Sequence, residues 1–286
     1  MIGIAQLSRR TGQVKMRNIK QRTTFFPAHP HISMKKHLTI LTGASRGMGL
    51  AMAEQLLNAD ALLLCISRGS SEALAQQAAS CGAELLQWQA DLSEAAPLAQ
   101  RLQEWLATRK GSEFASATLI NNAGVISELT PLRDAQTDHL ARALRVGLEA
   151  PMLLCAAFLG ATQGWTQVPR KVLNISSGLG RRAMASSSAY CAAKAGMDHF
   201  TRCLALEENH LASGAAVCSL APGVIDTDMQ VQLRSADAAQ FPDQSGFASL
   251  HEKGQLSSPA DAARRLLAYL NRPDFGSEPV ADVRVP

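Results

Sequence analysis

Short aliphatic runs alternate with amphipathic stretches along most of this chain. The aliphatic runs predict buried strands, and they read LTILTG, ALLLCIS, ELLQWQA, ATLINNAG, KVLNIS and AAVCSLAP. The stretches between and after them show helical spacing over residues 46–58, 70–81, 94–108, 137–163, 187–209 and 259–270. A last short strand is predicted near 279–283. Because parallel strands need crossover helices, this order predicts an α/β fold with a Rossmann-type, doubly wound parallel sheet.

The alternation fails over residues 228–256, where polar and apolar positions mix without a clear period. A long irregular segment inside a regular fold is typical of a lid, so we expect a substrate loop there. Elsewhere the pattern runs unbroken from Leu38 to the last strand. It predicts a single domain over residues 34–286.

The first 33 residues differ from the rest in charge. They carry six basic side chains and no acidic one, whereas the rest of the chain carries 22 basic and 24 acidic side chains. We predict a disordered basic extension that is translated from a start upstream of Met34, and the alternative is a mitochondrial targeting segment. Since the remaining chain has a slight negative balance, no nucleic-acid partner is expected.

The amino-acid composition indicates the size of the core and the cellular compartment of the protein. The chain has 286 residues, 47% of them hydrophobic, and can bury one large core. It contains no uninterrupted apolar run of about 18 residues, so neither a membrane span nor a membrane partner is expected. Its six cysteines are scattered singly, unlike those of a zinc site or a disulfide scaffold. We therefore expect no metal and a reducing, cytoplasmic location.

A glycine-rich turn joins the first predicted strand to the first predicted helix. It reads Thr42-Gly43-Ala44-Ser45-Arg46-Gly47-Met48-Gly49. Glycines let the backbone turn tightly and approach a pyrophosphate, whose charge then rests at the helix N-terminus. Three glycines alone would fit an ordinary loop equally well, but the strand–turn–helix context favours a dinucleotide site.

Two arginines indicate which dinucleotide binds. The second strand ends in Arg68, and neither Asp nor Glu stands where an adenosine ribose would be held. Arg68 and Arg46 are placed to clamp a 2′-phosphate with the forked geometry of guanidinium groups. This pattern favours NADP(H) over NAD(H), and the alternative is a pair of solvated surface arginines.

Ser177, Tyr190 and Lys194 form the pattern S-x12-Y-x3-K. A helix over 187–209 places Tyr190 and Lys194 on one face, because four residues separate them. A tyrosine with its ordinary pKa of about 10 shuttles protons poorly at neutral pH, and a neighbouring ammonium lowers that pKa by favouring the phenolate. Ser177 follows a strand, where its hydroxyl can polarise a substrate carbonyl. The three residues therefore predict proton donation to a carbonyl.

Together these features resemble the short-chain dehydrogenase/reductase family, from Leu38 to Val285. The resemblance implies hydride transfer between a nicotinamide and a carbonyl, with Tyr190 as the acid. It also implies that Lys194 holds the ribose hydroxyls of the cofactor. Further cofactor contacts implied by the resemblance are Asp91, Leu92, Asn122, Ala123, Gly124, Pro222, Gly223, Ile225 and Thr227.

Within the family the chain is most similar to sepiapterin reductases and benzil reductases. The similarity rests on the runs LALEEN, APGVIDTDMQ, GQLSSPADAARRLL and SEPVAD. It implies an NADPH-dependent carbonyl reductase for a small ketone, a diketone or a sepiapterin-like pterin ketone. The candidate substrate residues are Ser177, Leu179, Tyr190, Met229 and Asp282. Asp282 stands where sepiapterin reductases carry an aspartate that anchors the pterin, and an ordinary surface acid is the alternative.

One position departs from the family pattern. Gly147 stands where the family places an asparagine of its proton relay. Either water relays protons without that amide, or turnover is slower, or the alignment is shifted by one helical turn. The departure motivates an alternative function, an NADP(H)-binding sensor or regulator with weak or no turnover. The resemblance also implies a homodimer or homotetramer formed through the helices that contain 140–160 and 187–209.

Overall fold

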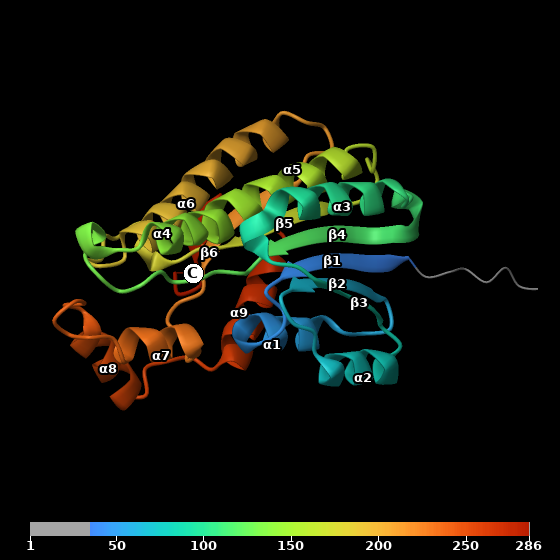
Figure 1. Cartoon of the computed structure of the whole chain (residues 1–286). Coiled ribbons are helices and arrows are strands. Elements are labelled where there is room, and N and C mark those ends of the chain that lie inside the picture. Colours follow the sequence, from blue (N-terminus) through green and yellow to red (C-terminus); the bar gives the residue numbers. More distant parts are fainter. Residues whose placement is uncertain (1–34, 286) are drawn as a thin grey trace, which may run out of the picture. The chain divides into compact units, whose positions relative to one another are not determined.

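The structure is a computed structural model that describes residues 35–285. The predicted leader at 1–33 lies outside the described residues. The described chain forms one parallel sheet with the strand order β3-β2-β1-β4-β5-β6-β7 (Figure 1). The strands are β1 (Lys36–Thr42), β2 (Ala61–Ser67), β3 (Glu84–Gln89), β4 (Phe114–Asn121), β5 (Arg170–Ile175), β6 (Ala216–Ala221) and β7 (Val280–Asp282). The predicted doubly wound fold is confirmed.

Helices cover both faces of this sheet (Figure 1). One face carries α3 (Ala95–Ala107), α4 (Thr137–Leu144), α5 (Ala150–Thr162) and α6 (Ser188–Asn209). The other face carries α1 (Gly47–Leu56), α2 (Glu72–Cys81) and α9 (Pro259–Leu270). Strand β2 shows why its sequence is apolar throughout: Leu62 and Leu64 pack into one core, while Leu63 and Cys65 pack into the other.

The chain reverses its direction of winding beside β1. Strands β2 and β3 extend the sheet on one side of β1, and β4 to β7 extend it on the other. Leu41 of β1 lies opposite Cys65 in β2 and opposite Ile120 in β4. In doubly wound sheets, ligands bind at the carboxyl ends of the strands beside such a reversal. The topology therefore places a site after β1 and β4.

The long helix predicted within 137–163 is interrupted. A π-helical segment, Arg145–Glu149, separates α4 from α5, and Gly147 lies in it. A Cβ atom at Gly147 would lie 2.9 Å from the Cβ of Ala193 in α6. Glycine therefore allows this segment to approach α6 closely. Such single-turn distortions occur frequently at functional sites.

The predicted substrate loop over 228–256 is partly helical. It contains two short helices, α7 (Asp228–Arg234) and α8 (Gln244–Glu252), beyond the carboxyl ends of the strands (Figure 1). Apolar side chains of these helices and of the turn between them form a separate small core, in which Leu233 of α7 and Phe241 of the turn pack with Met184. Helices this short show too few turns for a clear period and depend on tertiary packing.

The segment Thr137–Thr162 is long and apolar enough, by length and composition alone, to cross a membrane. Half of its most apolar window is buried inside the protein. Within it, Leu154 and Phe158 are fully buried in the main core with residues of α3. The segment is thus a core helix of the fold.

Candidate active site

A cavity of about 820 Å³ opens at the carboxyl ends of the central strands. Its volume falls in the range of cofactor and ligand sites in proteins, roughly 300–1,000 Å³. The cavity brings together nearly all the residues predicted from the sequence. Those lining it are Gly43, Ser45, Arg46, Gly47, Met48, Gly49, Arg68, Asp91, Leu92, Asn122, Ala123, Gly124, Ser177, Leu179, Tyr190, Lys194, Pro222, Gly223, Ile225, Thr227 and Met229.

The glycine turn at one end of this cavity is built for close approach by a ligand. Gly43 and Gly47 have φ angles of +72° and +54°, in the left-handed region that favours glycine. A Cβ atom at Gly49 would lie only 2.0 Å from the carbonyl oxygen of Gly43. Among the described residues, no side chain caps the first turn of α1, so its backbone N–H groups are available to an anion. These features fit a dinucleotide pyrophosphate.

Asn122 holds the glycine turn in place. Its Nδ2 donates hydrogen bonds to the carbonyl oxygens of Thr42 (2.9 Å) and Gly43 (3.2 Å). In return, the Thr42 hydroxyl accepts hydrogen bonds from the backbone N–H groups of Asn122 and Ala123. These contacts join the ends of β1 and β4 at the point where the winding reverses.

Charged side chains flank the cavity beyond the turn. Arg46 forms a 2.8 Å ion pair with Asp228 at the start of α7, and both side chains are mostly exposed. Asp91 accepts hydrogen bonds from the backbone N–H and the hydroxyl of Ser93, and it pairs with Arg142 at 3.2 Å. The Ser93 N–H holds the pKa of Asp91 below its ordinary value. Asp91 is therefore a carboxylate with a fixed orientation.

Tyr190 and Lys194 lie one turn apart on α6, and both are buried. The Nζ atom of Lys194 lies 5.8 Å from the centre of the Tyr190 ring and donates a 2.7 Å hydrogen bond to the carbonyl oxygen of Ile175. Burial raises the pKa of Tyr190, and the Ser177 hydroxyl acts in the opposite direction. Burial lowers the pKa of Lys194 to about 8, against the attraction of Asp198. The site therefore holds a protonated phenol beside an ammonium that titrates near neutrality.

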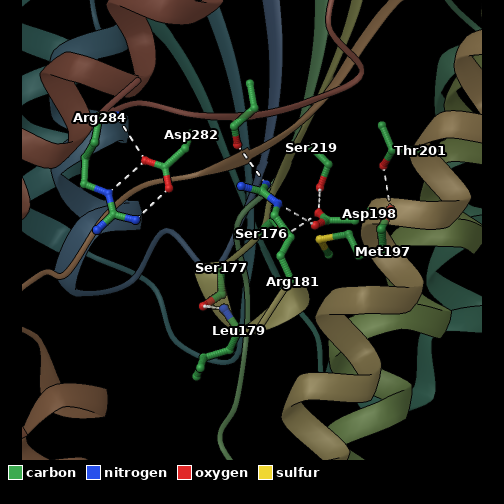
Figure 2. A network of polar contacts seen from close by, with 11 residues as sticks. Ser176, Ser177, Leu179, Arg181, Met197, Asp198, Thr201, Ser219, Asp282 and Arg284 are labelled. Carbon is green, nitrogen blue, oxygen red and sulfur yellow. Dashed lines mark hydrogen bonds and ion pairs between the residues drawn. The ribbon is translucent and has the colours of Figure 1, made fainter. Parts of the chain in front are cut away.

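Ser177 reaches the same place from the end of β5. Its hydroxyl oxygen accepts a 3.2 Å hydrogen bond from the backbone N–H of Leu179, which caps the short 3₁₀ turn Gly178–Gly180 (Figure 2). The fold thus brings together one hydroxyl from a strand end and two side chains from a helix. This grouping can bind and protonate a carbonyl oxygen.

Asp282 differs from the other candidate residues, because it does not line this cavity. Both of its carboxylate oxygens accept hydrogen bonds from Arg284, at 2.9 Å from Nε and 2.7 Å from Nη2 (Figure 2). This pairing holds the pKa of Asp282 below its ordinary value. Arg284 itself lines the cavity. A substrate that used Asp282 would have to displace Arg284.

Sequence reasoning missed a group of residues behind the site. Asp198, Ser176 and Arg181 form a polar cluster next to Ser177 (Figure 2). Lys194 lies one turn before Asp198 on α6. The spacing of Asp198, four residues after Lys194, was the signal that could have revealed it. Arg284 gave no comparable signal, since it lies outside every motif.

The chain is similar to known proteins over most of its length. A family model described as short chain dehydrogenase matches residues 37–238. Benzil reductase ((S)-benzoin forming) from Bacillus cereus is 34% identical over 236 residues, covering 82% of this chain and 94% of that protein. Sepiapterin reductase from Bos taurus is 30% identical over 250 residues, covering 84% and 91%.

A solved structure shows the same architecture. The protein comes from Beutenbergia cavernae, is provisionally assigned as an NAD(P)-dependent gluconate 5-dehydrogenase, and was crystallised with NADP. It superimposes with a TM-score of 0.72 at 25% identity, over 88% of this chain and 96% of that one.

Proposed function

Since the chain belongs to the short-chain dehydrogenase family, we propose that it is an NADPH-dependent reductase of a small ketone or diketone. As a member of that family it is an oxidoreductase that acts on CH–OH and C=O groups and uses a nicotinamide dinucleotide. One observation carries the proposal. Ser177, Tyr190 and Lys194 converge in the same cavity as the uncapped N-terminus of α1 and its glycine turn.

The chemistry of the protein side follows from this arrangement. A dinucleotide held at the glycine turn and the N-terminus of α1 would supply a hydride to the carbonyl carbon. Ser177 donates a hydrogen bond to the carbonyl oxygen, and Tyr190 donates its phenolic proton to the same atom. The Lys194 ammonium stabilises the resulting Tyr190 phenolate, which burial alone would disfavour. Gly147 in the π-helical segment has no side-chain amide, so we propose that water returns the proton to Tyr190, with slower turnover as the alternative.

The preference for NADPH rests on two cations. Arg46 and Arg68 both line the cavity, one from the glycine turn and one after β2. Arg46 already holds the Asp228 carboxylate, which shows that its guanidinium reaches an anion at this edge. A 2′-phosphate carries more charge than a carboxylate and accepts forked hydrogen bonds from both arginines.

The proposed substrate class is supported by the residues at the end of the cavity away from the glycine turn. Leu179 and Met229 line it there, and both pack against the small core of α7 and α8. Apolar walls suit an aryl or alkyl diketone, which is the class that the benzil reductase name describes. A pterin ketone, as the sepiapterin reductase name describes, is the second candidate, because Asp282 is paired with Arg284, which lines the cavity and would have to move for a substrate to reach Asp282.

We further propose a cytoplasmic homodimer or homotetramer, with the reductase domain over residues 34–286. Two large apolar side chains are exposed on the outer faces of α5 and α6, namely Met152 at 45% and Leu206 at 66%. Exposed apolar side chains on neighbouring helices suit a contact with a second copy.

A substrate panel tests the function. Purified protein is expected to oxidise NADPH faster than NADH with vicinal diketones such as benzil, with sepiapterin assayed beside them. Tyr190→Phe should lower kcat by roughly 10²–10⁴-fold, because it removes the general acid. The chain has two tyrosines, so Tyr269→Phe in α9 is the matched control and should retain activity. Full activity in Tyr190→Phe would refute the proposal.

A different function, an NADP(H)-binding sensor, is favoured by one observation, the glycine at position 147. It predicts that NADPH binds tightly while no ketone of the panel is reduced. Turnover on several diketones would exclude it. Binding is measured by the fluorescence of reduced nicotinamide in the absence of substrate. The same protein preparation is then assayed for ketone reduction, which distinguishes the sensor from the reductase.

A further inference from the structure

Four segments of the chain meet at one buried carboxylate, Asp198. This residue lies on α6 one turn beyond Lys194, and it is 2% exposed. It accepts hydrogen bonds from the hydroxyls of Ser176 (2.5 Å) and Ser219 (2.7 Å), and it pairs with Nε of Arg181 at 3.1 Å (Figure 2). The ends of β5 and β6 and the turn after Ser177 are therefore all attached to α6.

Ser177 is held from both sides by this cluster. Ser176 precedes it, and Arg181 follows the 3₁₀ turn that Ser177 caps. The turn lies directly on α6, because a Cβ atom at Gly180 would be 2.9 Å from the Lys194 carbonyl oxygen and 3.0 Å from Oδ2 of Asp198. Arg181 also donates a 2.9 Å hydrogen bond to the carbonyl oxygen of Ala281 in β7. The position of Ser177 relative to α6 thus depends on Asp198.

The charge of Asp198 acts on Lys194. Burial disfavours the ammonium, and Asp198 is the group that opposes this effect. The other ionisable groups around the pair are Tyr190 on the same helix, Arg181 on the turn and Cys218 on β6. Burial raises the pKa of Cys218 to about 12, so this thiol stays neutral. Arg181 is the cation that partly neutralises Asp198.

The buried Asp198 carboxylate requires an explanation, because burying a charge is costly and its partner Arg181 is itself 32% exposed. Neither Asp198 nor Arg181 lines the cavity, although both belong to the described part of the chain. They therefore act through their neighbours. We propose that Asp198 is a positioning residue that fixes the Ser177 turn against the helix of Tyr190 and Lys194 and supplies the counter-charge of the Lys194 ammonium. Its catalytic consequence rests on the proposed reductase function.

Two substitutions that act on Lys194 in opposite directions test this role. Asp198→Asn removes the negative charge but keeps the size of the side chain and an acceptor oxygen. The titration of Lys194 and the alkaline decline of kcat should then both move to lower pH by about one unit, the order expected for one charge a helical turn away. Arg181→Gln removes the neutralising cation, so both should move to higher pH.

Two readouts separate this inference from the proposed function. The first is the NMR signal of the isotope-labelled ε-carbon of Lys194, assigned with Lys194→Arg and followed against pH without any substrate. The second is kcat with NADPH and a diketone over the same pH range. A Lys194 signal that shifts as expected in a protein that reduces no ketone would refute the reductase and support the role of Asp198 at Lys194.

The control is a second Asp–Arg pair on the surface of α9, Asp261 with Arg264. Asp261→Asn and Arg264→Gln change the net charge equally and should leave the Lys194 titration where it is. Loss of packing alone would lower kcat without moving that titration in opposite directions. Shifts of the same sign in the two test variants, or no shift, would overturn the proposal. If Asp198→Asn does not fold, Arg181→Gln decides alone, because it lies in a partly exposed turn.

Discussion

The titration of Lys194 is what most directly makes the chemistry of the site depend on pH. The Lys194 ammonium donates a hydrogen bond to the Ile175 carbonyl oxygen, and burial lowers its pKa from 10.5 to about 8. Below that pH the ammonium is present and, in the proposed mechanism, stabilises the Tyr190 phenolate. Above it Lys194 is neutral, and proton donation by Tyr190 loses this support. Since burial raises the pKa of Tyr190, Lys194 titrates first.

We therefore expect kcat for carbonyl reduction to fall as pH rises through about 8. The decline should be close to tenfold per pH unit, because one proton is lost. The measurement is kcat at saturating NADPH and substrate from pH 6 to about 10, with folding checked by circular dichroism at each point. A rate that stays constant up to pH 10 would show that the charge of Lys194 is not required.

Gly147 departs from the family pattern in the sequence, and in the structure it lies close to Ala193 of α6. The family pattern identified it as a missing asparagine, but only the structure shows what glycine does there. Gly147→Asn should destabilise the fold by about 1–3 kcal/mol, because its Cβ atom would meet Ala193 at 2.9 Å. Thermal unfolding measures this loss. Gly160→Ala in α5 is the control, since nothing lies within 4 Å of its Cβ position, and it should be neutral or stabilising.

At the scale of elements, the sequence predicted what depends on local periodicity. The run ALLLCIS predicted β2 because both of its faces are buried, and the Tyr190–Lys194 spacing predicted one face of α6. It did not predict the π-helical segment Arg145–Glu149, because the widening there depends on contact with α6. The Asp198 cluster was missed for a similar reason, since its partners come from β5, β6 and a turn.

Helices α7 and α8 form a unit that is held to the rest by few apolar side chains. Phe241→Ala removes a fully buried ring of their small core, and it should open these helices locally at a cost of about 3–5 kcal/mol. Hydrogen exchange should then accelerate in 228–252 while β1 and β4 stay protected. The KM for substrate should rise, because Met229 packs against the same core.

The control for this local effect is Phe114→Ala, which removes an equally buried ring from the main core. That change should lower protection in the sheet and the temperature of global unfolding. Uniform loss of protection in Phe241→Ala would show instead that α7 and α8 unfold together with the sheet.

At the scale of the whole molecule, the remaining question is what covers the outer faces of α5 and α6. Their exposed apolar side chains stand out because the helices that carry them also build the site: α6 holds Tyr190 and Lys194, and the π-helical segment before α5 contacts it. A second copy packed on these helices would restrict their movement. Assembly and catalysis are therefore expected to depend on each other.

Leu206→Glu tests this dependence, because it places a charge on a side chain that is 66% exposed in the single chain. Burying an unpaired carboxylate between two copies is unfavourable, so the substitution should dissociate the oligomer and lower kcat. Light scattering during gel filtration gives the mass. Leu132→Glu is the matched control, since Leu132 is 60% exposed but lies outside both helices, and it should leave the mass unchanged. An oligomer that survives Leu206→Glu would place the contact elsewhere, and a monomeric wild type would exclude it.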